Sequence, residues 1–291
     1  MADQPVSYFK YLTASSANAV LKNRTLRWAT CPTFNDPADM QIDLEVIFDR
    51  DEVVRLALDL LWQRCEGKSS PATTDMARLI DMSRPTWLRM GRDEFGNKIG
   101  QGIHQTLDKL PIVTKKFSEE LRSKLATIKV ICFSERHDCN LMWSHYAESH
   151  SGLVLEFRNV DGLDSPYKMA KPIQYSARPP QFATNEELAR FISGDDAINR
   201  GLTDRMIYTK SDEWAYETEW RIQSGDGRKP GDPIEYAGFG DRELHAVYFG
   251  CKSSQETKDS LMPVIRKHYP YSEIWQAKRE MHTYALSFDR V

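Results

Sequence analysis

The nine-residue stretch WAYETEWRI, from Trp214 to Ile222, constrains the fold most strongly, because its apolar and charged side chains alternate. In a β-strand, successive side chains point to opposite faces. The apolar face would carry Trp214, Tyr216, Thr218, Trp220 and Ile222. The other face would carry Glu217, Glu219 and Arg221. The pattern predicts a strand that packs one face into a core and presents on the other either a polar site or a solvated ion-pair ladder.

Length and charge narrow the class of protein. The chain has 291 residues and a formal net charge of −3, which gives no global electrostatic reason to bind nucleic acid or an anionic membrane. Its five cysteines are odd in number, widely spaced and without a Cys-x-x-Cys pair, as expected for reduced thiols. The N-terminus does not resemble a signal peptide, and no apolar run is long enough to cross a bilayer. These features predict a cytoplasmic protein with no membrane partner.

The order of strand-like and helix-like segments predicts the fold class. Strands are expected at 7–12, 25–29, 129–134, 153–157, 214–222 and 244–250, with a terminal hairpin over 273–288. The block from Leu44 to Lys129 has helical periodicity, interrupted by a glycine-rich loop expected at 91–102. Strands that bracket a helical block predict an α+β fold with a mixed, mainly antiparallel sheet, continuous or split. We expect a single domain over 1–291 with a helical insertion at about 44–129.

A second unusual stretch, from Met142 to His150, is expected to form a helix over 141–149. Helical spacing places Met142, His145, Tyr146 and Ser149 on one face. An imidazole suits proton transfer near neutral pH, and a phenol ring can stack on a flat ligand. The alternative is an amphipathic core helix whose polar tips bond to the backbone.

Several familiar sites are not indicated. His145 and His150 are five residues apart, whereas zinc-binding histidines on a metalloprotease helix are four apart. The chain has no Gly-x-Ser-x-Gly element, no P-loop and no dinucleotide-binding glycine fingerprint. The sequence therefore favours no metal and neither a serine hydrolase nor a P-loop enzyme.

Five boxes, spread in order over nearly the whole chain, resemble a bacterial family. They are Tyr8–Tyr11, Leu26–Pro37, Cys132–Ser134, Met142–Gly152 and Trp214–Arg221. Together they are similar to the domain-of-unknown-function 2971 family, some of whose relatives accompany abortive-infection and phage-defence genes. The family name carries no assigned activity, and the block from 44 to 129 lies outside the boxes.

A more distant resemblance suggests a chemistry. Glu217-Thr218-Glu219 resembles the Glu-x-Glu element of ADP-ribosyltransferases, which begins a strand in a split mixed sheet. This analogy implies NAD as a substrate, Glu219 as the stabiliser of an oxocarbenium-like transition state and Glu217 as the base on the acceptor side. The remaining implied roles are stacking on nicotinamide by Tyr11 or Tyr146, orientation of the ribose by Ser134 or His145, and anchoring of NAD by Lys10 or Arg27. The acceptor, a protein or a nucleic acid, and the oligomeric state stay open.

Two rival hypotheses use the same residues differently. In a metal-dependent nuclease or phosphodiesterase, Glu217, Glu219 and Asp36 would hold Mg²⁺. In a non-catalytic sensor or interaction module, the aromatic residues would form a binding surface. Asn35 and Asp36 are expected either to fix a ligand hydroxyl or only to form a turn before Pro37. The candidate catalytic residues are thus Glu219, Glu217 and His145, and the candidate binding residues are Tyr11, Lys10, Arg27, Asn35, Asp36, Ser134, Tyr146 and Arg221.

Overall fold

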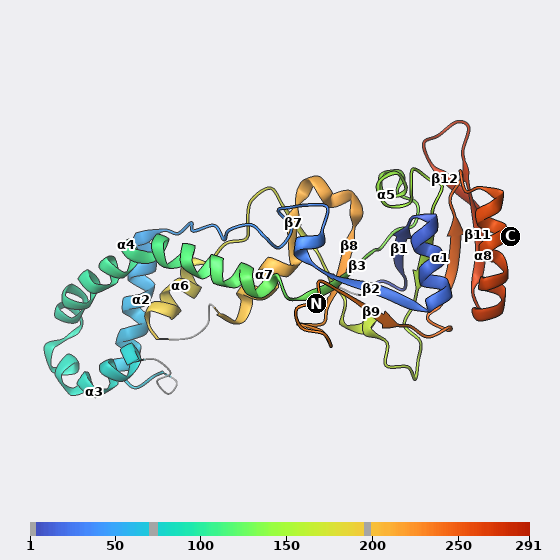
Figure 1. Cartoon of the computed structure of the whole chain (residues 1–291). Coiled ribbons are helices and arrows are strands. Elements are labelled where there is room, and N and C mark those ends of the chain that lie inside the picture. The colour runs from blue at the N-terminus through green and yellow to red at the C-terminus, as the bar shows by residue number, and fades with distance from the viewer. Residues whose placement is uncertain (1–3, 70–74, 195–198) are drawn as a thin grey trace. The chain divides into compact units, whose positions relative to one another are not determined.

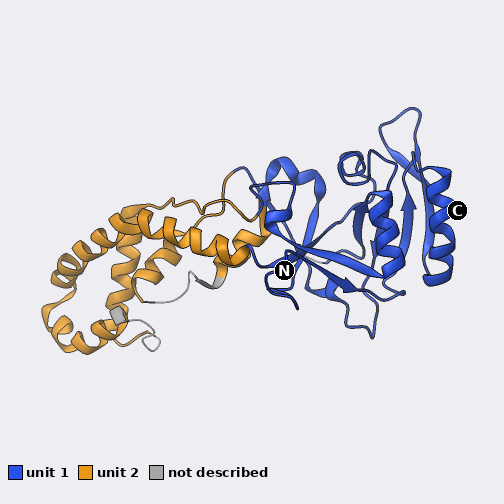
Figure 2. Ribbon diagram, in the orientation of Figure 1, with its two compact units in different colours: residues 1–39, 126–177, 210–291 blue, residues 40–125, 178–209 orange. Residues whose placement is uncertain are grey.

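The computed structural model describes residues 4–69, 75–194 and 199–291. The chain forms two compact units, coloured separately in Figure 2. The first contains Met1–Asp39, Ala126–Ala177 and Lys210–Val291, and the second contains Met40–Leu125 and Arg178–Thr209.

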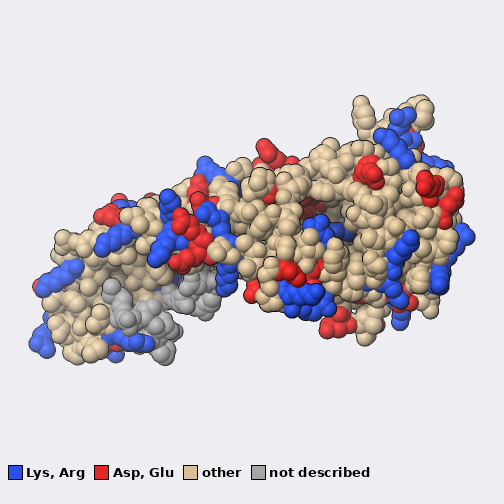
Figure 3. All heavy atoms as spheres, viewed as in Figure 1, with Lys and Arg blue, Asp and Glu red and all other residues tan. Residues whose placement is uncertain are grey.

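Basic and acidic side chains are interspersed over the visible face of the described residues in both units, so the described part of this face carries no large patch of a single charge sign (Figure 3).

A ten-stranded sheet forms the centre of the first unit (Figure 1). Eight of its strands lie in the order β12-β11-β10-β4-β1-β3-β2-β9, while β8 pairs with β3 and β5 pairs with β8. The strands are β1 (Tyr8–Leu12), β2 (Thr25–Thr30), β3 (Lys129–Ser134), β4 (Leu153–Phe157), β5 (Lys171–Pro172), β8 (Glu219–Gln223), β9 (Ile234–Gly238), β10 (Leu244–Phe249), β11 (Glu273–Arg279) and β12 (Leu286–Arg290). Only β10 and β11 run parallel. The α+β class and the mixed, mainly antiparallel sheet are confirmed.

The sheet divides at β3. One edge of β3 pairs with β8 from Val130 to Ser134. On its other edge, β2 pairs only with Lys129 and Val130, and β1 pairs only with Ser134. Between these contacts, the described strands leave residues 131–133 of β3 without a neighbour on this edge. The backbone there is free to face a cavity instead of another strand.

Helices cover both faces of the sheet. On one face, α1 (Ala14–Asn23) lies beside α8 (Gln255–His268), above a core that includes Trp220 and Ile222 (Figure 1). On the opposite face, α5 (Asn140–Tyr146) buries Trp143 against Tyr11 and other ring side chains. The Thr13 side chain caps α1 by accepting a hydrogen bond from the Ser16 backbone.

The expectation of one strand from Trp214 to Ile222 is wrong for its first half. Residues Asp212–Glu217 form a 3-10 helix, η3, and β8 begins only at Glu219. Thr218 turns the chain between them with a φ of 41°. The pairing with β3 ends where Glu219 meets Ser134, so the preceding residues have no partner strand to hold them extended. Trp220 and Ile222 do lie on the apolar face, as expected.

Helix α5 ends at Tyr146, three residues earlier than expected. The next residues, Glu148, Ser149 and His150, all have positive φ, between 51° and 72°, which a right-handed helix does not allow. The chain then turns into β4 at Gly152, where a Cβ atom would lie 2.2 Å from the Leu12 carbonyl oxygen. Gly152 is therefore required for the close approach of this turn to β1.

The second unit is helical. Its helices are α2 (Arg50–Cys65), α3 (Asp75–Met90), α4 (Arg92–Leu125), α6 (Asn185–Ile192) and α7 (Asn199–Tyr208). The expectation of a loop at 91–102 is wrong, because α4 begins directly after Gly91 and includes Gly96, Gly100 and Gly102. Buried Phe95, Ile103 and Leu107 give the first half of α4 an apolar face, and such packing outweighs the low helix propensity of glycine. From the sequence, Thr73 and Thr74 are also expected to begin a helix, and these two residues lie outside the described ones. None of the described helices is long and apolar enough to span a membrane.

Candidate functional site

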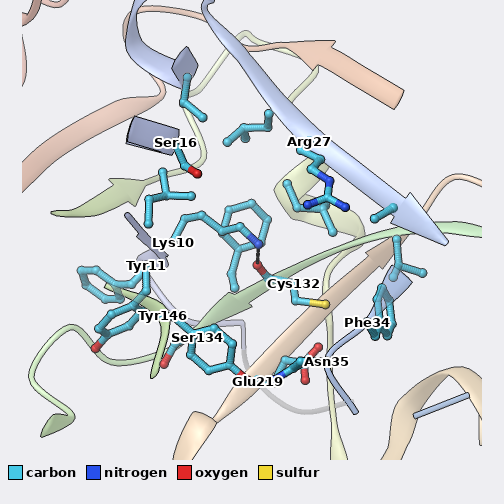
Figure 4. A pocket seen from close by; sticks show the side chains of 18 of the residues that line it. Lys10, Tyr11, Ser16, Arg27, Phe34, Asn35, Cys132, Ser134, Tyr146 and Glu219 are labelled. Carbon is cyan, nitrogen blue, oxygen red and sulfur yellow. Dashed lines mark hydrogen bonds between the residues drawn. The ribbon is translucent and has the colours of Figure 1, made fainter. Parts of the chain in front are cut away.

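A cavity of about 520 Å³ lies where the sheet divides, between β1, β2 and the central residues of β3 (Figure 4). Helix α1 contributes part of its wall. Of the residues expected at a site, the cavity is lined by Lys10, Tyr11, Arg27, Asn35, Ser134, Tyr146, Glu217 and Glu219. Segments far apart in the sequence therefore converge on one space within the first unit.

Three residues expected at the site do not line this cavity. His145 is exposed, and its Nδ1 lies 3.1 Å from the Tyr216 hydroxyl. Asp36 is largely buried and accepts a hydrogen bond from the Ala38 backbone at 2.9 Å, as a turn residue does. Arg221 is fully buried behind the carboxylates that it contacts.

Five buried charged groups form a connected cluster at one wall of the cavity, and all of them except Arg221 line it. The Arg221 guanidinium donates to both carboxylate oxygens of Asp39, at 3.0 and 2.8 Å, and lies 2.8 Å from Glu219 Oε1. The Lys210 ammonium lies 2.6 Å from Glu217 Oε2 and 3.2 Å from Glu219 Oε2. Three carboxyl groups thus face two cations, so one negative charge is uncompensated when all five are ionised.

The two glutamates differ in how readily they take up a proton. Burial by itself would raise the pKa of Glu219, but Arg221 and Lys210 outweigh it and lower the pKa to about 2. Burial raises the pKa of Glu217, with the Glu219 carboxylate adding to the rise and Lys210 opposing it. Burial likewise raises the pKa of Asp39. Glu219 therefore stays ionised, while Glu217 and Asp39, which also line the cavity, take up a proton more readily; of these two, only Glu217 is free of contact with Arg221.

The lowered pKa of Glu219 gives a testable acid dependence. A carboxyl whose pKa is lower in the folded state stabilises the fold above its unfolded pKa, near 4.5, and loses that contribution as the pH falls toward 2. Glu219→Gln should therefore lose less of its own stability over this range than the parent does. Urea unfolding at several pH values measures the difference. Equal acid sensitivity of parent and variant would contradict the ionised state assigned to Glu219.

Tyr146 orients Glu217 from the side of α5. Its hydroxyl donates to Glu217 Oε1 at 2.6 Å and accepts from Asn35 Nδ2 at 3.0 Å. Burial and the Glu217 carboxylate raise the pKa of the Tyr146 hydroxyl, which keeps it protonated as a donor. One carboxylate oxygen of Glu217 thus contacts Tyr146 and the other contacts Lys210.

Two cations line the cavity apart from the buried cluster. Lys10 Nζ donates to the Cys132 carbonyl oxygen at 2.7 Å, across the opening in the sheet (Figure 4). Burial lowers the pKa of Lys10, although the nearby Glu219 and Glu217 favour its charged form. Arg27, on β2, is exposed, and its guanidinium makes no hydrogen bond or ion pair within the described residues. An anionic group that enters the cavity would find a donor at Arg27 that no protein group occupies.

Lys210 and Asp39 are the functional residues that the sequence did not reveal. Lys210 belongs to the short strand β7 (Thr209–Ser211), and Asp39 follows the turn at Pro37. The sequence separation of Lys210 and Asp39 from Glu219 and Arg221 matches no known motif. Only the fold brings Lys210 and Asp39 next to Glu219 and Arg221. The sequence offered one general indication, namely that a buried carboxylate needs a cation beside it.

The donor set does not suit a metal ion well. Among the described residues, no group of three or more histidine, cysteine, aspartate or glutamate side chains is placed to hold one. Lys210 and Arg221 already contact Glu217 and Glu219, and Asp36 does not line the cavity. The Mg²⁺ site of the phosphodiesterase hypothesis therefore finds no geometric support.

The chain is thus an α+β protein with a cavity where its sheet divides. Buried carboxylates in ion pairs with Lys210 and Arg221 form one side of that cavity. Residues 142–222 match the model of the family described as protein of unknown function (DUF2971), which confirms the resemblance seen in the sequence. The matched segment includes Tyr146, Lys210, Glu217, Glu219 and Arg221. No curated protein and no solved structure matches the chain significantly.

Proposed function

We propose that the chain is an enzyme of ADP-ribosyltransferase character that binds NAD in the cavity of the divided sheet. The observation that carries the proposal is the pair of adjacent carboxyl groups, Glu217 and Glu219, whose surroundings shift their pKa values in opposite directions. Such a pair supplies one permanent anion and one group able to transfer a proton. These are the two roles that transfer of a glycosyl group requires.

Bond breaking would rely on Glu219. When the bond between nicotinamide nitrogen and ribose C1′ breaks, nicotinamide leaves with the electron pair and positive charge develops on the ribose. Glu219 is held in place by Arg221 and Lys210, and the cluster has one negative charge to spare. A fixed anion in a water-poor site stabilises a developing cation without reorganising.

Bond formation would rely on Glu217. The acceptor's nucleophilic atom forms a bond to C1′ and gives its proton to the Glu217 carboxylate. Tyr146 and Lys210 hold one oxygen each of this carboxylate, which fixes its orientation toward the cavity. Water or a macromolecule can serve as the acceptor in this scheme. Consumption of NAD or modification of a host molecule would accord with a role in phage defence or as a toxin.

The cations of the cavity would bind the diphosphate of NAD. Arg27 has donors that no protein group uses, and the Lys10 ammonium gains a counter-charge when a phosphate is near. The Tyr11 ring is only 6% exposed and packs edge-on against Trp143, whereas Tyr146 is half-buried and lines the cavity. Of the two rings, Tyr146 is therefore the better placed to stack on nicotinamide.

Binding of NAD tests the proposal first. Arg27→Gln removes an exposed charge and should raise the Kd for NAD by about 10-fold or more, because a charge-assisted hydrogen bond is worth about 1.5–3 kcal/mol. The matched control is Arg266→Gln, an exposed arginine on α8 that does not line the cavity. Isothermal titration calorimetry gives all three constants. Failure of the parent to bind NAD, or equal Kd values in parent and Arg27→Gln, would contradict this site.

A further inference from the structure

A second cavity in the first unit has no part in the proposed reaction. Its volume is about 590 Å³, and it lies where β4 ends and β10 begins. The polar residues that line it are Arg158, Asn159, Asp161, Arg242, His245 and Tyr271. It shares no residue with the lining of the first cavity.

Arg158 is held rigidly at the edge of this cavity. Its Nε and Nη2 lie 2.8 and 2.6 Å from Oε1 of Glu156, a carboxylate with only 2% exposure. Glu156 also accepts hydrogen bonds from the Ser7 hydroxyl at 2.6 Å and the Tyr248 hydroxyl at 2.7 Å. Within the described residues, Nη1 of Arg158 makes no hydrogen bond or ion pair. The guanidinium is thus oriented in advance, with donors left for a ligand.

His245 reaches the cavity because β10 carries a bulge. The register between β10 and β4 shifts between Leu244 and Ala246, so His245 is the extra residue. Leu244 and Ala246 are both fully buried, whereas His245 is half-buried and lines the cavity. A bulge redirects a side chain at the expense of strand pairing, and bulges are common beside binding sites.

The remaining groups complete a site of mixed polarity. Arg242 is exposed, and its guanidinium makes no hydrogen bond or ion pair within the described residues, while its backbone N–H donates to Asp241. The side-chain oxygen of Asn159 is buried and accepts no hydrogen bond there. Asp161 adds one carboxylate, and the Tyr271 ring is 70% exposed. The set thus offers cationic donors, acceptors for hydroxyl groups and a flat ring.

We propose that the second cavity binds a nucleoside monophosphate. The phosphate would bind to Arg158, Arg242 and His245, whose donors match its oxygens. The ribose hydroxyls would donate to Asp161, and the base would stack on the exposed Tyr271 ring. This binding does not depend on the reaction proposed for the first cavity.

The test titrates AMP, inorganic phosphate and adenosine into the full-length chain and follows binding by calorimetry. AMP should bind most tightly, and Arg242→Gln should raise its Kd about 10-fold or more, the loss of one charge-assisted contact. Tyr271→Ala should weaken AMP binding but leave phosphate binding unchanged. Arg27→Gln, which alters only the first cavity, and the surface control Arg266→Gln should bind AMP as the parent does.

Each other outcome overturns the inference. No binding of AMP, or an equal Kd in parent and Arg242→Gln, would show that this cavity is not the site. Loss of AMP binding in Arg27→Gln alone would place the nucleotide in the first cavity. If phosphate and AMP bind with equal affinity and Tyr271→Ala has no effect, the cavity binds an anion but does not recognise a nucleoside. The melting temperature of each variant, measured alongside, confirms that it is folded.

Discussion

Replacing Arg221 with methionine is expected to lower the free energy of unfolding by about 3–5 kcal/mol, the range found when one partner of a buried ion pair is removed. Arg221 has no exposed surface, and it neutralises Asp39 and Glu219, which are only 5% and 4% exposed. Methionine leaves both carboxylates buried, and among the described residues Lys210 is then the one cation still in an ion pair with them. Chemical denaturation followed by tryptophan fluorescence measures the change.

The matched control for this change is Arg27→Met. Arg27 is exposed and has no partner within the described residues, so its replacement should alter stability by less than about 0.5 kcal/mol. A variant Arg221→Met that unfolds like the parent would contradict the buried cluster. In that case Asp39 and Glu219 would have to be solvated in solution.

Replacing Glu217 with glutamine should lower the rate of NAD cleavage or transfer by about 10²–10⁴-fold, the usual contribution of general acid–base catalysis. Glutamine keeps the shape and can still accept from Tyr146 or Lys210, but it cannot take up the acceptor's proton. The fold should survive, because the change removes the excess negative charge of the cluster. Chromatographic measurement of nicotinamide release gives the rate.

Glu213→Gln is the control for this prediction, since Glu213 is an exposed acid on the same 3-10 helix. Glu219 is a poorer test of catalysis, because it also neutralises Arg221 and its loss would affect stability and activity together. Full activity in Glu217→Gln would remove this residue from the chemistry. An equal loss in Glu213→Gln would point to damage of the helix rather than of a base.

Local patterns in the sequence were sufficient to predict the central strands of the sheet. The apolar runs at 129–134 and 153–157 are strands, and alternation places Trp220 and Ile222 on the core face as expected. Local sequence patterns gave wrong secondary structure at positions where contacts with distant parts of the chain determine the conformation. Alternation continued past the point where β3 stops pairing, so it did not reveal the turn at Thr218. Glycine composition suggested a loop in what is the packed start of α4.

The site was only partly predictable for a related reason. Glu217 and Glu219 were singled out by the alternation of charged and apolar side chains, and Lys10 by resemblance to ADP-ribosyltransferases; the fold places all three around one cavity. Lys210 and Asp39 carry no local signal, because their role is to neutralise or bind charges that only the fold brings near. The sequence shows that charges are present, whereas their pairing follows from long-range topology.

The most direct measurement follows both halves of NAD, labelled separately in the nicotinamide and in the adenine, after incubation with the chain and a cell lysate as a source of acceptors. The proposed chemistry predicts that the labels separate, with free nicotinamide in one fraction and an intact ADP-ribosyl group on water or an acceptor in the other. It also predicts that Glu217→Gln does not separate them whereas Glu213→Gln does. Labels that stay together would mean binding without this reaction, and release of AMP would mean cleavage of the diphosphate instead. Either result would contradict transfer of an ADP-ribosyl group.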